Sequence, residues 1–205
     1  MAITTYSELQ TAVGDFLNRD DLTTVQTTFI DLAEADFNRR IRHWRMEKRS
    51  TATFDSQYES LPSDFLEAIR INIQTERQIE LASVAEIIEK RRQFNNTAGE
   101  PRLYAMTAGE IELWPTPDAS YTGEIVYYSR IEALSDSNTS NWLLSYHPDV
   151  YLYGTLVHSA PYLKDDPRLQ IWRALLEGAL AGLAGEDRDY RHGGTGLRLR
   201  RRGMS

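Results

Sequence analysis

The sequence contains no cysteine, so disulfides, thiolate metal ligands and cysteine nucleophiles are excluded. Histidine is scarce, with four residues at His43, His147, His158 and His192. No two of them stand at the i, i+4 spacing that places two metal ligands on one helix face. Of the four, we expect His158 to face the core. The sequence also lacks a Gly-x-Ser-x-Gly elbow, a phosphate-binding glycine loop and a dinucleotide fingerprint. These absences predict a protein that is not an enzyme, with no catalytic residue, cofactor or metal.

Long apolar runs and an excess of positive charge are also missing. No apolar segment approaches the length of a membrane span, and the N-terminus lacks the basic and apolar regions of a secretion signal. We therefore expect no membrane partner. The chain has 30 Asp and Glu against 23 Lys and Arg, a formal net charge of −7. An acidic body repels nucleic-acid phosphates, which argues against general DNA wrapping.

The 205 residues, 41% apolar and 26% charged, suit one globular domain or one domain with an insertion. Hydrophobic periodicity is helical at both ends and two-residue in the middle. We expect an α+β fold: N- and C-terminal helices form one bundle, a strand-rich, β-sandwich-like lobe is inserted between them, and an extended arm follows. The predicted segments are N-terminal bundle helices at 1–48, the lobe at 49–134, C-terminal bundle helices at 135–190 and a flexible basic arm at 191–205.

The N-terminal segment predicts two helices. Thr5-Tyr6-Ser7-Glu8 is a capping box that begins the first helix, which should end near Asn18. The second helix carries apolar residues at helical spacing from Leu22 to Trp44. Its last turns are crowded with cations, which suit the negative end of a helix or could form a nucleic-acid patch: Arg39, Arg40, Arg42, Arg45 and Lys48.

The middle of the chain, 49–131, alternates apolar and polar residues as strands do. Residues 102–107 and 110–114 stand at hairpin distance, separated by Ala108-Gly109. One short helix is predicted among the strands, because Ser83-Val84-Ala85-Glu86 is a second capping box. Beyond the strands, residues 135–141 form a polar loop to which we assign no packing role.

Prolines mark the boundaries of the C-terminal helices. Pro148 and Pro167 each suit a first helical turn, with Asp166 as the N-cap of the second of these helices. Pro161 should kink or end the helix that begins near Pro148.

The last predicted helix has two distinct faces. Its core face should join the other helices in one buried cluster, formed by Phe29, Phe37, Trp44, Leu156, Trp172, Leu176 and Leu180. Its second face carries small residues, namely Ala174, Gly178, Ala181, Gly182 and Gly185. An interior glycine costs a helix roughly 1 kcal/mol against alanine, so we expect close packing on a neighbouring helix to compensate. That neighbour could belong to the same chain or to another copy.

The C-terminal tail differs in composition from the rest of the chain. From Tyr190 to Ser205 there are five arginines and no acidic residue, and three glycines within residues 193–196 precede alternating Leu and Arg. Such a segment cannot bury a core by itself, but in an extended strand its leucines would share one face and its arginines the other. We interpret it as an arm that becomes ordered on a partner, with the docking residues Leu197, Arg198, Leu199, Arg200, Arg201 and Arg202.

Several strings along the chain occur in a characteristic order. They lie at 5–9, 17–22, 29–34, 38–42, 58–67 and 109–115, and are followed by Pro148-Asp149-Val150-Tyr151-Leu152-Tyr153-Gly154-Thr155-Leu156 and Ala160-Pro161-Tyr162-Leu163-Lys164-Asp165-Asp166. In content and order these strings resemble the head–tail adaptor proteins of tailed bacteriophages, and the resemblance covers nearly the whole chain.

The resemblance implies a structural virion protein without catalytic activity. Adaptors of this kind form a dodecameric ring beneath the portal, extend the DNA channel used in genome ejection, and offer a platform to the tail. Their C-terminal arm docks on the portal. The implied partners are the portal protein, tail or nozzle proteins and other copies of the chain, with double-stranded DNA passing through the lumen. The implied location is the head–tail junction of the virion, and the host cytoplasm during assembly.

Two alternatives from other functional classes stay open at the level of sequence. One is a DNA-binding accessory protein that uses the arginine-rich tail and the cationic end of the second helix. The other is a hydrolase that uses carboxylates of the strand-rich lobe.

Overall fold

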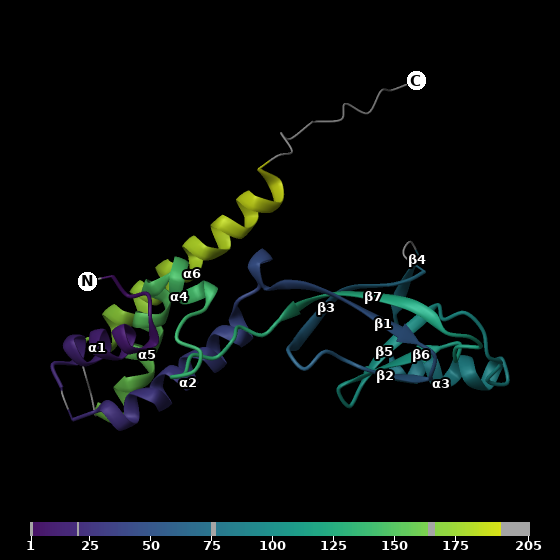
Figure 1. Ribbon diagram of the computed structural model, residues 1–205, viewed down its shortest axis with the longest axis horizontal. Coiled ribbons are helices and arrows are strands. Elements are labelled where there is room, and N and C mark those ends of the chain that lie inside the picture. Colours follow the sequence, from purple (N-terminus) through teal and green to yellow (C-terminus); the bar gives the residue numbers. More distant parts are fainter. Residues whose placement is uncertain (1, 20, 75–76, 164–166, 194–205) are drawn as a thin grey trace, which may run out of the picture. The chain divides into compact units, whose positions relative to one another are not determined.

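The computed structural model describes residues 2–19, 21–74, 77–163 and 167–193. The chain forms two compact units, one from residues up to 45 together with those from 131 onward, and one from residues 46–130. The first unit is helical, and the second contains a seven-stranded sheet and one helix (Figure 1). The predicted α+β fold class, with a strand-rich lobe between helical segments, is confirmed.

The helical unit is arranged around α5 (Pro148–Leu163), which contacts α1 (Tyr6–Leu17), α2 (Thr23–Arg40), α4 (Trp142–Tyr146) and α6 (Leu169–His192). The capping box of α1 is present: the Glu8 N–H donates to the Thr5 hydroxyl, and the Thr5 N–H donates to the Glu8 carboxylate. Asn18 ends α1 in the left-handed conformation. Pro161 lies inside α5, two residues before its end.

Large apolar side chains of several helices fill the core of this unit. Of the predicted cluster, five members are buried, namely Phe29, Phe37, Leu156, Trp172 and Leu176. Trp44 and Leu180 are only half-buried. Additional buried residues come from α1 and α5, among them Leu9, Val13, Val150 and Tyr151.

Two helix boundaries differ from the prediction. The helix α2 ends at Arg40, because Ile41 adopts an extended conformation with φ −90° and ψ 130°. Ile41 is nevertheless buried, so the apolar spacing continues past the end of the helix, and Trp44 begins the short 3-10 helix η1 (Trp44–Met46). The helix α6 begins at Leu169 rather than at Pro167, and the predicted cap Asp166 lies outside the described residues.

The lobe consists of β1 (Glu47–Phe54), β2 (Tyr58–Ser60), β3 (Phe65–Ile73), β4 (Arg77–Leu81), β5 (Leu103–Thr107), β6 (Glu110–Trp114) and β7 (Tyr121–Ser129), with α3 (Val84–Gln93) between β4 and β5. The strands are ordered β1-β7-β3-β4-β5-β6-β2. The β4–β5 pair is parallel and the other pairs are antiparallel. The predicted hairpin is the β5–β6 pair, and Ala108 and Gly109 form its turn with φ of 52° and 84°.

Strands from both ends of the sheet share one apolar core. Phe54 of β1 and Ile125 of β7 are buried in the same cluster as Ile111 and Leu113 of β6. Because β1 and β6 are far apart in the strand order, the sheet must curl around this core. Helix α3 is attached to the sheet through Ile87, which packs with Ala82 and Ala105.

Candidate interaction surfaces

The buried histidine of the helical unit is His43, which packs between aromatic side chains. Its ring stacks on Trp142 at a centroid distance of 5.1 Å, and its Nδ1 accepts the N–H of Arg45. Burial lowers the pKa of His43, which favours the neutral form. The expected core histidine, His158, is only half-buried. Within the described ranges, no group of three or more His, Asp or Glu side chains could hold a metal ion.

The small-residue face of α6 is open. Ala174, Gly178, Ala181 and Gly182 are exposed, and Gly185 is half-buried. A Cβ added at Gly178, Gly182 or Gly185 would meet no atom of the described chain within 4 Å. The expected close helix packing is therefore not made by a described helix of the same chain.

This open face continues into an apolar stripe. Ile171 is 60% exposed and Leu175 43% exposed. Together with Gly178 and Gly182 they recur at spacings of four, three and four residues, which places them along one side of a helix. A groove of about 520 Å³ lies beside the stripe, where His147, Asp149 and Tyr153 approach the small residues of α6.

The close helix contact inside the unit is made by a different glycine. A Cβ at Gly154 of α5 would lie 2.4 Å from the ring of Phe37 on α2. The same ring meets Tyr151 edge-on, at a centroid distance of 5.2 Å. Gly154 therefore allows α2 and α5 to approach each other, which is the role that the sequence suggested for Gly178 and Gly182.

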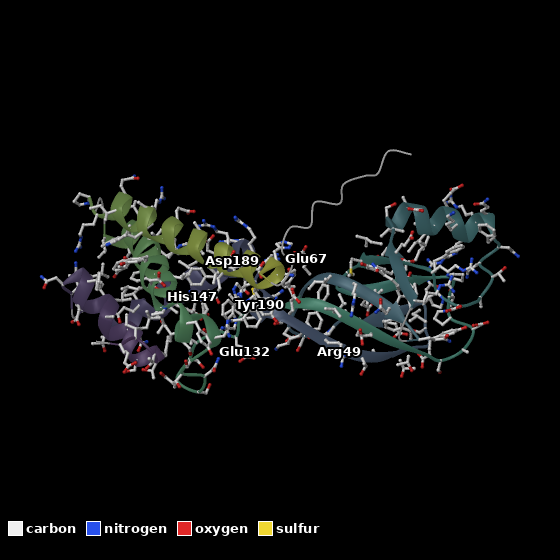
Figure 2. All side chains as sticks on the ribbon, turned by 90° about the horizontal axis from the view of Figure 1, so that it is seen from above. Arg49, Glu67, Glu132, His147, Asp189 and Tyr190 are labelled. Carbon is white, nitrogen blue, oxygen red and sulfur yellow. The ribbon has the colours of Figure 1, made fainter. Side chains whose placement is uncertain are left out.

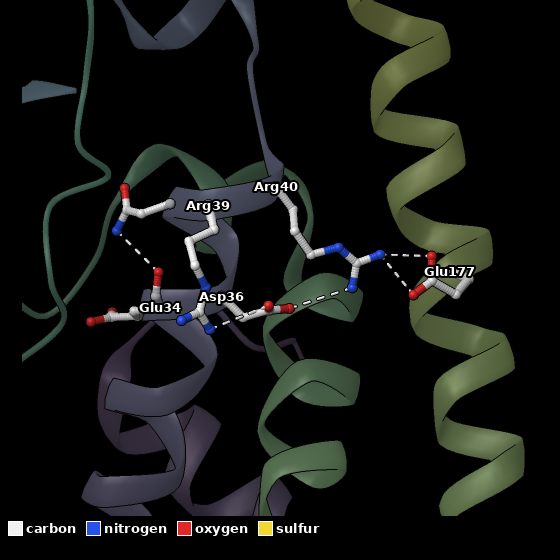
Figure 3. A network of polar contacts seen from close by, with 6 residues as sticks. Glu34, Asp36, Arg39, Arg40 and Glu177 are labelled. Carbon is white, nitrogen blue, oxygen red and sulfur yellow. Dashed lines mark hydrogen bonds and ion pairs between the residues drawn. The ribbon is translucent and has the colours of Figure 1, made fainter. Parts of the chain in front are cut away.

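The predicted cationic cluster is largely paired with other groups. Arg40 Nη2 donates to both carboxylate oxygens of Glu177 at 2.7 Å, and its Nη1 donates to Asp36 at 3.4 Å (Figure 3). Arg39 lies 3.5 Å from Asp36, and Arg42 donates to backbone carbonyls. Lys48, in the lobe, is bound to Asp64 at 2.8 Å. These contacts give the cations structural roles and weaken the nucleic-acid interpretation of the cluster.

The last turns of α6 are anchored to the segment around Trp44. The Trp44 and Tyr190 rings stack at 4.1 Å with an interplanar angle of 13°. The Trp44 N–H donates to Asp187 Oδ1, while Arg191 Nε donates to Asp187 Oδ2, each at 2.7 Å. Figure 2 places Tyr190 at the end of α6, where it is still 63% exposed. Arg45 stacks against the rings of both Trp44 and Tyr146.

The proposed arm residues Leu197, Arg198, Leu199, Arg200, Arg201 and Arg202 lie outside the described residues. The described chain reaches Gly193, the C-cap of α6, whose N–H donates to the Asp189 carbonyl. Of the described helices, none is long and apolar enough to cross a membrane.

Comparison with protein families gives one match that spans both units. A family model described as SU10 adaptor protein matches residues 4–200. This range contains every helix and strand described above and extends into the arm. Comparison with curated protein sequences gives no significant match.

Proposed function

Because the chain belongs to the SU10 adaptor protein family, we propose that it is a head-to-tail adaptor of a tailed bacteriophage. In this role, copies of the chain form a ring, a dodecamer, beneath the portal. The ring extends the channel for double-stranded DNA and offers the tail or nozzle proteins a platform. The observation that carries this proposal is the family match, which covers the helical unit and the lobe together.

The exposed stripe on α6 supports a contact between neighbouring copies in such a ring. Ile171 and Leu175 offer apolar area to a partner. Gly178 and Gly182 lack a Cβ and have free space in front of them, so a second helix can approach their backbone closely. Contact with another copy would also compensate for the low helix propensity of these glycines.

The C-terminal arm is proposed to attach the ring to the portal. The arm would add a strand to an exposed edge of a portal sheet, with Leu197 and Leu199 in apolar pockets. Its arginines would meet acidic portal residues, which makes the association sensitive to salt. The acidic body suits a channel that must release DNA, because it does not attract phosphate.

Electron microscopy and mass photometry of the protein, with and without portal, test the ring. The informative variant is Gly178→Leu, since the open space at Gly178 should let the chain fold normally while the new side chain blocks close helix approach. The matched control is Arg173→Leu, which adds the same side chain at an exposed position of α6 away from the stripe. We expect rings from the control and none from Gly178→Leu. Normal rings from both variants would remove the stripe from the interface.

A further inference from the structure

The sheet of the lobe has a gap between β3 and β5 at the point where β4 stops. β4 pairs with β3 only at residues 71–73, and with β5 only at Leu103 and Tyr104. After Leu81 the chain turns away into α3, which is capped by Ser83. Among the described strands, residues 65–70 of β3 and 105–107 of β5 therefore have no ladder partner on the side that a longer β4 would occupy.

This gap is an apolar groove of about 730 Å³, which we call the β3–β5 groove. Its lining includes Phe65 and Leu66 from β3, Leu81 from the end of β4, and Met106 from β5. The register of β3 against β7 shifts twice here, between Phe65 and Glu67 and between Ala68 and Arg70. The sequence neighbours Phe65 and Leu66 both line the groove.

The burial of the β3 side chains decreases at the point where the pairing with β4 ends. Ile71 and Ile73 are fully buried, whereas residues 65–70 are half-buried or exposed. Leu81 is 67% exposed at the same place. Apolar side chains beside an unpaired strand edge form a surface that an added strand can cover, because backbone groups and side chains are satisfied together.

We propose that the β3–β5 groove binds residues 197–200 of a second copy of the chain, in extended conformation and parallel to β5. In this arrangement Leu197 and Leu199 enter the groove and Arg198 and Arg200 face outward, since alternate side chains of a strand point to opposite sides. The backbone of the added segment pairs with residues 105–107.

Three observations select this occupant. The twelve residues 194–205 follow α6 and lie outside the described structure, and within them Leu and Arg alternate over a length that matches the open edge. The lobe sequence, residues 46–130, has 14 acidic and nine basic residues, whereas residues 194–205 have four arginines and no acid. The groove itself is lined by one acid, Glu67, and one base, Arg130, so the charge complementarity with the arm rests on the acidic excess of the lobe as a whole.

A second copy and a portal would compete for the same segment. The groove is therefore occupied when the arms are not bound to a portal, and portal binding removes the arm segment from the groove.

The test uses a fluorescent peptide of residues 193–205 and the full-length protein carrying Leu197→Asp and Leu199→Asp, so that its own arms do not compete. We expect saturable binding by fluorescence anisotropy. Leu81→Arg, at an exposed groove position, should weaken the peptide affinity at least tenfold. Ile69→Arg, at an exposed position of β3 that does not line the groove, should leave it unchanged. A peptide with the same composition and both leucines adjacent should bind more weakly than the natural one.

Hydrogen exchange supplies the second measurement. The peptide should slow amide exchange at residues 105–107, and in the unmodified protein this protection should increase with protein concentration. Protection that does not depend on concentration would assign the groove to the arm of the same chain and overturn the proposal. Absence of peptide binding, equal binding to Leu81→Arg, or protection only by a tail-protein segment would overturn it as well. Portal capture is measured separately, so a chain that binds portal but not the peptide contradicts this inference and leaves the adaptor role intact.

Discussion

At the scale of single residues, the helical unit depends on the absence of a side chain at Gly154. The Phe37 ring occupies the space that a Cβ would need, and Phe37 itself is almost completely buried. The ring cannot move aside, because its neighbours are packed at the density of a protein interior. Gly178, by contrast, faces open space.

We therefore predict opposite effects for the same substitution at these two glycines. Gly154→Ala should lower the free energy of unfolding by about 1–3 kcal/mol through overpacking. Gly178→Ala should raise it by up to about 1 kcal/mol, because alanine is the better helix former. Urea unfolding of the two variants beside the unmodified protein measures both. Equal effects would mean that helix propensity alone determines the change in the free energy of unfolding and that the contact with Phe37 is unimportant.

Glu34 is a buried acid that anchors the chain where it returns from the lobe. Its Oε1 accepts the Leu134 N–H at 2.8 Å and the Tyr151 hydroxyl at 3.0 Å. Asn141 donates to the Tyr151 oxygen at 2.6 Å and also caps α4. The expectation that residues 135–141 have no packing role is therefore wrong for Asn141, which is buried in this network.

The environment of Glu34 predicts a dependence of stability on pH. Burial raises the pKa of Glu34 above its usual value of 4.5, so the folded state holds the proton more tightly than the unfolded state. The stabilisation from this proton is complete below pH 4.5 and is lost as pH rises through the raised pKa. Glu34→Gln keeps an oxygen that can accept both hydrogen bonds and has no proton to lose. Its stability relative to the unmodified protein should increase with pH above 4.5 in urea unfolding. A constant difference across this range would contradict the assignment.

At the scale of elements, α3 is held on the sheet by a buried ion pair. Arg91 Nη1 bonds to Glu112 Oε1, and Arg91 Nη2 donates to the Leu113 carbonyl at 3.2 Å. Glu112 is only 3% exposed, so its carboxylate depends on Arg91 for its countercharge.

Removal of this arginine should destabilise the lobe strongly. Arg91→Ala leaves an uncompensated buried carboxylate, which typically costs about 3–5 kcal/mol. Arg40→Ala is the matched control, because it breaks the more exposed pair with Glu177, where the loss should stay below about 1 kcal/mol. The double variant Arg91→Met with Glu112→Leu should recover much of the loss, since apolar side chains can replace a buried pair. Denaturant unfolding compares all three, and a small effect of Arg91→Ala would show that the pair is not needed.

The end of α6 is the other element whose stability rests on a small number of contacts. Tyr190→Ala removes the ring that stacks on Trp44, an interaction worth about 0.5–1.5 kcal/mol beyond burial. We expect faster hydrogen exchange in the last two turns of α6 and little change in the global unfolding transition, because helix ends open locally. Arg188→Ala, at an exposed position of the same helix, is the control. Unchanged exchange in Tyr190→Ala would show that other contacts hold this end.

At the scale of the whole molecule, charge is divided between an acidic body and a basic tail. The segment after Gly193 contains four of the 23 Lys and Arg and none of the 30 Asp and Glu. Deletion of residues 194–205 keeps the Gly193 cap of α6 and should leave the melting temperature unchanged. We predict that the truncated protein no longer attaches to portal-containing heads, as measured by co-sedimentation. If it instead loses DNA affinity and keeps portal binding, the tail serves nucleic acid rather than the portal.

The features that the sequence predicted correctly depend on neighbouring residues. The capping box at Thr5, the end of α1 near Asn18 and the β5–β6 hairpin each follow from residues within a few positions of one another. Alternating and helical periodicity were sufficient for the α+β class with its strand-rich lobe. The small residues of α6 were also visible as a face, because helical spacing is a local property.

What only the tertiary structure decided depends on which elements meet. The sequence cannot tell that Gly154 faces Phe37 while Gly178 faces open space, because a glycine looks the same in both settings. The apolar spacing predicted that the second helix continues to Trp44, whereas α2 ends at Arg40. The spacing is misleading here because an apolar residue such as Ile41 can pack on the core after the helix has ended. The burial of His43 likewise depends on tertiary contacts, such as its stacking on Trp142, which the sequence pattern does not encode. The strand order, the parallel β4–β5 pair and the groove where β4 stops arise from pairings between distant segments, which local periodicity does not encode.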